Sequence, residues 1–541
     1  MKKVKLLCIS IFVISSSFSY GQSWQWGEQT TGGTCITTDG QGNAYLFDGF
    51  VTKYDPAGNV LWATVPPTNS IHTAGAGSSA DNAGNVYLTG DFNDTIQFGP
   101  YTLLAPPFGI YLVKYSSSGS ILWAKQTNYG GGAGPFFIEV ISIATDKNGN
   151  ALLTGVFEGN VVFGKDTLYS TSSDVFIAKY DTAGNVLWAK AGVSNPTNLI
   201  GGYSITSDNS GNVLVAGFFE GGLQFGAFPL NDYYSLDIFL VKYDANGNVL
   251  WANQGTTQGG GGGFAGNLCV TTDLAGYSYI TGSLDDTVWF GNKMLISNNS
   301  HGSFYLTKYD PAGSVVWAKT SKGTWAGFAL SSDTNNNIYF TGLDWAGMDT
   351  VNDTLQFGGF NYVDPPTTNY LNNYQGARFI LKCDTSGHVL CSSIIYGGTG
   401  DCHYGTSIVS DPTGTNIYVA ASSASDTMAF GPDTLIAVGY PYLARWNPCN
   451  SEEGIPPINS ACNVVLYPNP NNGQFTIELS GLCEKSSVAV YNILGEQIYT
   501  AKINAATTQL DLSNNTSGIY LYTVLSETGR LVSDGKFIIQ K

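Results

Sequence analysis

The sequence predicts an all-β protein that contains a seven-bladed β-propeller and a small C-terminal β-sandwich. The composition is the first reason, because 67 glycines and 13% aromatic residues accompany only 12% charged residues in a chain of 541. Such a mixture is typical of strands joined by tight turns. The second reason is a repeated unit of about 60 to 74 residues, and the third is a C-terminal segment that departs from this repeat.

The first 21 residues have the pattern of a signal peptide. Basic residues precede a short apolar run, 6–14, and small residues follow at Ser19 and Gly21. We expect cleavage after Gly21, so that the mature chain begins at Gln22. The apolar run is too short to span a membrane as a helix, and we expect no membrane-spanning segment in the mature chain.

The mature chain is strongly acidic. The leader carries three of the 23 basic residues, so 20 basic residues remain against 40 acidic ones and the net charge is −20. A surface of this sign repels phosphate backbones, which argues against nucleic acid as a partner.

One register of the repeat is a lysine-containing block, Lys-Tyr-Asp-Thr-Ala-Gly-Asn-Val-Leu-Trp-Ala-Lys, at 179–190. It predicts a strand, a hairpin turn and a second strand that contains a tryptophan. The first residue of the block recurs at intervals of 61 to 74 residues, at Lys53, Lys114, Lys179, Lys242, Lys308, Lys382 and Arg445.

A second register is an aspartate at the end of a short strand. In most units it opens an Asp-x-x-Gly-Asn turn, in which Asp accepts backbone N–H groups and Gly and Asn tolerate positive φ. Capping of a turn explains one carboxylate per unit better than a calcium site, which needs several converging oxygens. These aspartates are Asp39, Asp81, Asp146, Asp208, Asp273, Asp333 and Asp411.

Each unit therefore predicts four antiparallel strands, the usual content of a propeller blade. The seventh unit has no fourth strand after Arg445, because the chain continues into Asn447-Pro448-Cys449. The segment 23–29 is similar to the fourth strand 122–126, and we expect it to close the ring as the missing outer strand, with Trp24 as its reference position. The predicted propeller spans 22–449.

The Asp-x-x-Gly-Asn-x-Tyr-x-Thr-Gly and Lys-Tyr-Asp-x-x-Gly-x-x-x-Trp blocks resemble the bacterial SBBP-type β-propeller repeat. The resemblance covers about residues 23–449 and implies a propeller whose ligand is undefined.

After a polar, Pro-containing linker at 450–462, residues 463–541 have alternating apolar strands with Gly and Asn turns, which predict a small Ig-like β-sandwich. This segment resembles the type A sorting domain of the type IX secretion system of Bacteroidetes. The resemblance implies the secretion machinery as partner, passage through the periplasm, and a secreted or outer-membrane surface location. Its motif residues here are Tyr467, Pro468, Asn469, Pro470, Gly473, Tyr491, Gly495, Gly518 and Tyr520.

We find no pattern typical of a catalytic, metal or cofactor site. The four histidines, His72, His301, His388 and His403, share no position in the repeat and form no metal-ligand pair. Eight cysteines remain after export, and an oxidising compartment favours disulfides among them, with a connectivity that the sequence leaves open. A zinc site is the alternative, although no Cys-x-x-Cys spacing occurs.

The long insert of the sixth unit is the best candidate binding surface, because its polar loop contains Trp345, Tyr362, Tyr370 and Tyr374. We therefore expect a secreted or surface-exposed non-enzymatic protein that binds a glycan or a protein. Two alternatives are an extracellular polysaccharide lyase or hydrolase and a structural coat component.

Overall fold

The structure is a computed structural model with two compact units, Met1–Asn450 and Ser451–Lys541, which we describe separately. The predicted leader and all of the predicted linker except Cys462 lie outside the described residues. The described residues are 23–30, 35–47, 50–64, 75–130, 137–194, 200–231, 236–258, 268–284, 286–297, 302–323, 325–344, 354–363, 378–395, 407–422, 428–430, 433–435, 441–447, 462–481, 486–492, 497–503, 505, 507–526 and 531–541.

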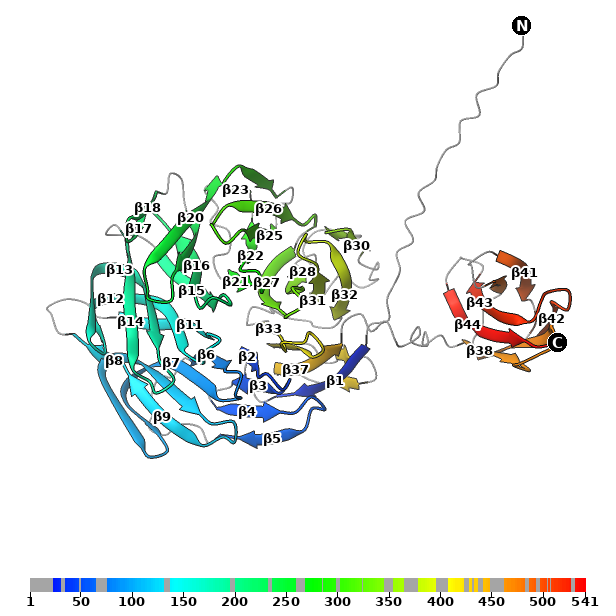
Figure 1. Cartoon of the computed structure of the whole chain (residues 1–541), viewed down its shortest axis with the longest axis horizontal. Helices are drawn as coiled ribbons and strands as arrows, with labels where there is room; N and C mark the ends of the chain where they lie inside the picture. The colour runs from blue at the N-terminus through cyan, green and yellow to red at the C-terminus, as the bar shows by residue number, and fades with distance from the viewer. Residues whose placement is uncertain are drawn as a thin grey trace, which may run out of the picture. The chain divides into compact units, whose positions relative to one another are not determined.

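The described part of the first unit consists of strands, turns and loops, and its strands include seven sets of four antiparallel strands (Figure 1). We number these sets as blades 1 to 7 in chain order. Blade 1 consists of β2 (Cys35–Thr38), β3 (Ala44–Phe47), β4 (Val51–Tyr54) and β5 (Val60–Ala63), and blade 2 consists of β6 (Gly75–Ala80), β7 (Val86–Phe98), β8 (Tyr101–Tyr115) and β9 (Ile121–Gln126). Blade 3 consists of β11 (Phe137–Thr145), β12 (Ala151–Phe163), β13 (Asp166–Tyr180) and β14 (Val186–Ser194). Blade 4 consists of β15 (Ile200–Ser207), β16 (Val213–Phe219), β19 (Asp237–Tyr243) and β20 (Val249–Gln258). Blade 5 consists of β21 (Cys269–Thr272), β22 (Ser278–Leu284), β25 (Ser303–Tyr309) and β26 (Val315–Thr320). Blade 6 consists of β27 (Trp325–Ser332), β28 (Ile338–Asp344), β31 (Arg378–Cys383) and β32 (Val389–Ile395). Blade 7 consists of β33 (Ser407–Ser410), β34 (Ile417–Ser422), β37 (Pro441–Asn447) and β1 (Ser23–Gln29).

The first strands of the blades contact one another in cyclic order. β2 contacts β6, and the series continues through β11, β15, β21, β27 and β33, which returns to β2. This closed series makes the unit a β-propeller and is compatible with the seven blades that the repeats predict.

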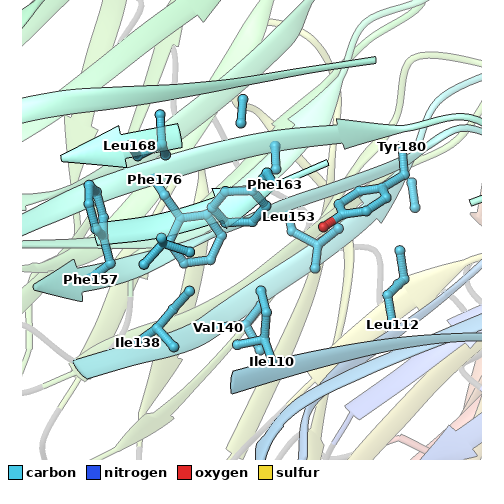
Figure 2. Close-up of a cluster of buried hydrophobic side chains, with 14 of the residues drawn as sticks. Ile110, Leu112, Ile138, Val140, Leu153, Phe157, Phe163, Leu168, Phe176 and Tyr180 are labelled. Atoms are coloured by element: carbon cyan, nitrogen blue, oxygen red, sulfur yellow. The ribbon is translucent and has the colours of Figure 1, made fainter. Parts of the chain in front are cut away.

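The core lies between successive blades, because both faces of each blade are apolar. Figure 2 shows one such layer, in which Ile110 and Leu112 of β8 meet Ile138 and Val140 of β11. A similar layer joins blade 7 to blade 1 and contains Trp26, Ile36, Tyr418 and Leu443 among others. Since no blade buries its faces alone, the stability of each blade depends on its neighbours.

The N-terminal strand closes blade 7 as predicted, through antiparallel pairing of β1 with β37. The reference residue differs from the predicted Trp24. A bulge between Trp24 and Trp26 places Trp26 opposite Arg445, whereas Trp123 lies opposite Lys114 in blade 2. Trp26 is therefore the equivalent of the repeated tryptophan. The same bulge occurs in blade 2, between Lys114 and Tyr115, so it belongs to the repeat. The sequence did not reveal Trp26 because the segment contains two tryptophans two residues apart.

The repeated tryptophan joins each outer strand to the next blade. Trp188 of blade 3 donates its Nε1–H to the carbonyl of Ala245 in blade 4 at 3.0 Å, and its ring lies against Gly247. Trp26 forms the corresponding bond to Pro56 of blade 1 at 3.0 Å. The other donor and acceptor pairs are Trp62 and Ser117, Trp123 and Thr182, Trp251 and Pro311, and Trp317 and Thr385.

Blade 6 has Cys391 where the other blades have tryptophan, and this cysteine is in a disulfide. The topology explains why tryptophan is dispensable here. Blade 7 takes its outer strand from the N-terminus, so its third and fourth strands, β37 and β1, are not joined by the hairpin turn whose carbonyl accepts the bond in the other blades.

Hairpins inserted between the second and third strands extend the blades. The hairpin of β17 (Gly222–Phe225) and β18 (Phe228–Asn231) in blade 4 pairs with β14 of blade 3, and that of β23 (Thr287–Phe290) and β24 (Lys293–Ile296) pairs with β20. Phe225, the last residue of β17, covers a glycine of that outer strand, so a Cβ on Gly192 would lie 2.3 Å from the Phe225 ring. The remaining short strands are β10 (Asn128–Tyr129), β29 (Thr354–Phe357), β30 (Phe360–Val363), β35 (Met428–Phe430) and β36 (Asp433–Leu435).

The second unit consists of two antiparallel sheets around one apolar core. β38 (Cys462–Tyr467), β39 (Gln474–Gly481) and β42 (Thr507–Asp511) form one sheet. β41 (Gln497–Ile503), β40 (Ser486–Tyr491), β43 (Gly518–Ser526) and β44 (Leu531–Ile539) form the other. Phe475 and Phe537 meet between the sheets with ring centroids 4.5 Å apart. This arrangement is the β-sandwich that the sequence predicts.

Candidate functional site

The structure does not bring the predicted binding aromatics together in its described part. Trp345, Tyr370 and Tyr374 lie outside the described residues. The backbone of Tyr362 belongs to β30, where it pairs with Leu355, but its side chain is not described. These residues therefore stay a prediction.

The repeated aspartates hold their turns, as predicted. Asp39 accepts hydrogen bonds from the backbone N–H groups of Gln41 and Asn43 at 2.9 and 3.0 Å. Its second oxygen accepts from the Asn43 amide and from the Tyr45 hydroxyl, each at 2.8 Å. Both carboxylate oxygens are thus occupied within the repeat, which supports turn capping over a ligand-binding role.

The repeated lysines form buried ion pairs with these aspartates in blades 1 to 4. Lys179 lies 2.9 Å from Asp146, and the two side chains are 4% and 0% exposed. Burial alone raises the pKa of Asp146, but hydrogen bonds from Asn150 and Lys179 outweigh it and hold that pKa below its ordinary value. The other pairs are Lys53 with Asp39, Lys114 with Asp81 and Lys242 with Asp208.

Tyrosines beside these pairs link one blade to the next. The Tyr45 hydroxyl of blade 1, which bonds to Asp39, also lies 2.9 Å from the carbonyl oxygen of Gly84 in blade 2. At the closure, Tyr418 of blade 7 donates to Gly42 of blade 1 at 2.7 Å. The three residue types therefore serve the blades and their seams in different combinations: the ion pairs occur in blades 1 to 4, and tyrosines of blades 1, 2, 6 and 7 bond to the next blade. We assign all of them a structural role.

One group of titratable residues falls outside these networks, and we call Asp91, Glu139 and Tyr203 the Asp91 cluster. Asp91 follows Gly90, the last residue of β7 that pairs with β6, and Glu139 and Tyr203 lie on the innermost strands β11 and β15. Asp91 lies on the same face of β7 as Tyr87, which bonds to Gly149 of blade 3, so its side chain also faces blade 3.

The Asp91 cluster is electrostatically coupled. Burial, with a smaller contribution from Glu139, raises the pKa of Asp91 to about 6. Burial and then Glu139 also raise the pKa of Tyr203. The Asp91 Oδ1 atom is buried without a hydrogen-bond partner. Sequence reasoning missed this cluster because blades 3 and 4 have Val156 and Phe218 at the position of Asp91, so no repeated pattern marks it.

The expectation of disulfides among the cysteines holds for Cys391 but not for every cysteine of the described residues. Cys269 and Cys383 carry free thiols. Cys269 occupies the strand position of Ser204, and its Sγ accepts the N–H of Leu330 at 3.3 Å, so it substitutes for a serine in a seam between blades. Burial raises the pKa of the Cys383 thiol to about 12, which leaves it unreactive.

Within the described residues we find no group of three or more His, Cys, Asp or Glu side chains that is arranged to hold a metal ion. The same part of the chain contains no helix long and apolar enough to cross a membrane.

In the second unit, the Tyr-Pro-Asn-Pro segment covers the edge of β44. The Asn469 side chain accepts the N–H of Ile538 at 2.9 Å and donates to the carbonyl of Lys536 at 3.3 Å. Asn471 continues the contact, because its N–H donates to Ile538 and its carbonyl accepts the N–H of Gln540. The segment therefore satisfies backbone groups of an otherwise open sheet edge.

The other predicted motif residues fall into distinct places. Gly473 has φ of +103°, and a Cβ there would lie 2.6 Å from Ser513, so only glycine fits. Tyr520 points inward, stacks on Phe537 and donates its hydroxyl to Thr516 at 2.7 Å. Tyr491 is half-buried on the outer face of β40.

Gly518 begins β43, and Tyr467 is 42% exposed with its hydroxyl donating to Glu478 at 3.0 Å. The Pro468 carbonyl accepts a hydrogen bond from the Asn471 side-chain amide at 3.3 Å, and Gly495 lies outside the described residues.

These features define an exported β-propeller protein with a sorting domain. Residues 465–540 match the family model of the secretion system C-terminal sorting domain, which indicates export through the type IX secretion system to the cell surface or beyond. An uncharacterised WD repeat-containing protein of Acanthamoeba polyphaga mimivirus is 26% identical over 371 residues, covering 54% of this chain. The chain spans only about a quarter, 26%, of that relative.

Several solved structures are similar to the chain at low scores. Virginiamycin B lyase from Staphylococcus aureus has a TM-score of 0.36 and 10% identity, covering 78% of this chain and 98% of its own. A DUF4221 family member from Bacteroides vulgatus has a TM-score of 0.31 and 7% identity, covering 80% of this chain and 99% of its own. PorZ, a surface component of the type IX secretion system of Porphyromonas gingivalis, has a TM-score of 0.14 and 11% identity, covering 92% of this chain and 85% of its own. At these scores the likenesses carry no conclusion about function.

Proposed function

We propose that the mature protein is a non-enzymatic binding or adhesion scaffold at the cell surface, exported by means of its sorting domain. The observation that carries this proposal is the use of the repeated polar residues. The repeated aspartates cap turns, the lysines pair with them in blades 1 to 4, and several tyrosines bond to the next blade, which makes a rigid support for variable loops. An exported, rigid support with divergent loops fits a binding function better than a repeated chemical site.

The ligand that we propose is a cell-surface glycan or protein, contacted by the blade 6 insert with Trp345, Tyr362, Tyr370 and Tyr374. Aromatic rings combine a large apolar face with a polar edge, and both groups of ligands present surfaces of this mixed kind. The resemblance to an SBBP-type repeat leaves the ligand undefined, so the insert has to supply the specificity.

A glycan array and a pull-down with the purified mature chain test this proposal. We expect a ligand whose binding is lost in the double variant Tyr370→Ala/Tyr374→Ala. Tyr169→Ala is the matched control, because Tyr169 is 69% exposed on the hairpin of another blade. Absence of any ligand, together with abundant surface display, would favour a structural coat component instead.

An extracellular polysaccharide lyase or hydrolase is the second candidate, and the Asp91 cluster favours it. A carboxyl group with a pKa of about 6 is half protonated at about pH 6, much closer to neutrality than an ordinary aspartate, and a general acid requires such a shift. Glu139 is exposed beside it and would act as the base. Turnover on a polysaccharide panel that disappears in both Asp91→Asn and Glu139→Gln would establish this function and exclude the scaffold.

A further inference from the structure

The outer face of the β43–β44 pair is unusually apolar for a solvent-exposed sheet. Ile519 and Leu521 of β43 are 50% and 44% exposed, and Ile538 of β44 is 41% exposed. Among the described residues of the second unit, only two other large apolar side chains are as exposed, Val465 and Tyr467 on β38. Exposed apolar side chains that adjoin one another mark interaction sites more often than scattered ones do.

The strand register shows that these side chains adjoin one another. Ile519 lies directly opposite Ile538, and Leu521 lies between Tyr491 of β40 and Lys536 of β44. Directly opposed residues have Cβ atoms about 4.5 to 5.5 Å apart. We define the β43–β44 face as the five residues Tyr491, Ile519, Leu521, Lys536 and Ile538, of which Lys536 lies at the edge.

The sorting motif supports this face from two sides. Tyr491, one of the motif residues, belongs to the face itself. Asn469 and Asn471 hold the backbone of β44 at Lys536, Ile538 and Gln540, which fixes the strand that contributes Ile538. Tyr520 anchors β43 from the inside, between Ile519 and Leu521. Asn469, Asn471 and Tyr520 therefore position β43 and β44, and the outward side chains of these two strands contribute most of the face.

Charge indicates the kind of partner. The segment 463–541 contains five basic and six acidic residues, so it is nearly neutral, whereas residues 22–450 contain 15 basic and 32 acidic residues. Lys536 is exposed and lies opposite Leu521. A partner surface that is otherwise apolar but carries an acidic group would complement its charge.

The geometry points to the β43–β44 face as the surface by which the sorting domain docks on the type IX secretion machinery, on an apolar patch that carries an acidic group. This inference rests on the proposed function only in that both require export of the chain. Asn469 and Asn471 act in it as positioning residues.

The test compares charged variants of the full-length chain in a bacterium with a type IX secretion system. Leu521→Glu places the new charge opposite Lys536, and the control Val465→Lys places one opposite Glu478 on the other sheet, so each new charge has an opposite partner. We expect Leu521→Glu to lower the secreted fraction about tenfold, with accumulation in the periplasm, since a loss of 1.4 kcal/mol in docking is tenfold. Val465→Lys is expected to be secreted normally.

Thermal unfolding of both purified variants separates docking from folding, and we expect midpoints within about 2 °C of the wild type. Normal secretion of a Leu521→Glu/Ile538→Glu double variant would overturn the inference, as would an equal loss in Val465→Lys. A wild-type dimer that Leu521→Glu dissociates while secretion stays normal would assign the face to a second copy and also overturn it. If the wild-type chain itself is not secreted, the proposed function fails instead.

Discussion

At the scale of single residues, the repeated aspartate and lysine show how a buried charge is tolerated in this ring. Lys179 and Asp146 are almost completely buried, yet each has an oppositely charged neighbour at 2.9 Å and hydrogen bonds to its remaining atoms. The burial penalty of such a pair offsets much of the Coulomb attraction. The pair therefore contributes more to the specificity of the seam than to its net stability.

Replacement of Asp146 by asparagine is predicted to destabilise the propeller strongly. The substitution leaves the buried Lys179 ammonium without its counter-charge, which costs about 3 to 5 kcal/mol. The denaturant midpoint of the purified chain measures the change. Asp181→Asn is the control, because Asp181 opens an equivalent turn in the same blade but is only half-buried. An equal effect of the two substitutions would show that the turn, not the ion pair, determines the loss.

Asp91 gives the chain a predicted pH dependence of the opposite sign to that of the paired aspartates. Its folded pKa of about 6 exceeds its ordinary value of 3.8, so the folded state binds its proton more tightly than the unfolded state does. Its stabilising contribution is complete below pH 3.8 and is lost as the pH rises through 6. We expect Asp91→Asn to raise the unfolding midpoint at pH 7.5 and to leave it nearly unchanged at pH 4.

The paired aspartates provide the comparison for this experiment. The folded pKa of Asp146 lies below 3.8, so its contribution is present above that pH and is lost as the pH falls through the folded value. A variant Asp91→Asn that behaves like the wild type at both pH values would contradict the raised pKa of Asp91.

At the scale of elements, the seam depends on a glycine that leaves room for a tryptophan ring. Gly247 has φ of +83°, and a Cβ there would lie 2.8 Å from the Trp188 ring. Gly211 has nearly the same φ, +82°, in a turn of the same type, but its Cβ would meet nothing closer than 4.0 Å. The two glycines thus share the backbone strain and differ in the packing.

We predict that Gly247→Ala is more destabilising than Gly211→Ala. Both variants incur the left-handed penalty of about 1 to 2 kcal/mol. Only Gly247→Ala also displaces a packed ring, which adds about 1 to 3 kcal/mol. Chemical denaturation of the two variants gives the difference directly, and equal losses would exclude a role for the Trp188 contact.

The elements also show which parts of the fold are predictable from sequence. The strand order and the closure by the N-terminal segment followed from repeated turns and strands, since a hairpin turn fixes the register of the strands it joins. The choice between Trp24 and Trp26 did not, because both tryptophans lie in one short strand and the strand pairing alone decides which of them is opposite Arg445. Trp345, Tyr370 and Tyr374 lie in the parts of the blade 6 insert that extend beyond the hairpin present in other blades, so no repeated pattern constrains their placement.

At the scale of the whole molecule, closure of the ring depends on a strand from the opposite end of the chain. β1 is joined to blade 7 by its pairing with β37 and to blade 1 by Trp26, whose indole bonds to Pro56 and lies against Gly58. Without β1, the edge of β37 and the apolar layer between blades 7 and 1 would both be exposed.

Removal of residues 1–29 is therefore predicted to lower the unfolding midpoint of the propeller and to make it aggregate through the open edge of β37. A synthetic peptide of the sequence 23–29 restores the missing strand and is expected to recover part of the midpoint, because the pairing is otherwise preformed. A peptide with alanine at both Trp24 and Trp26 is the control. The predicted loss of stability arises at a single seam of a closed ring. An unchanged unfolding midpoint in the truncated chain would therefore mean that the other seams suffice for closure. In that case β1 would contribute only the outer strand of one blade.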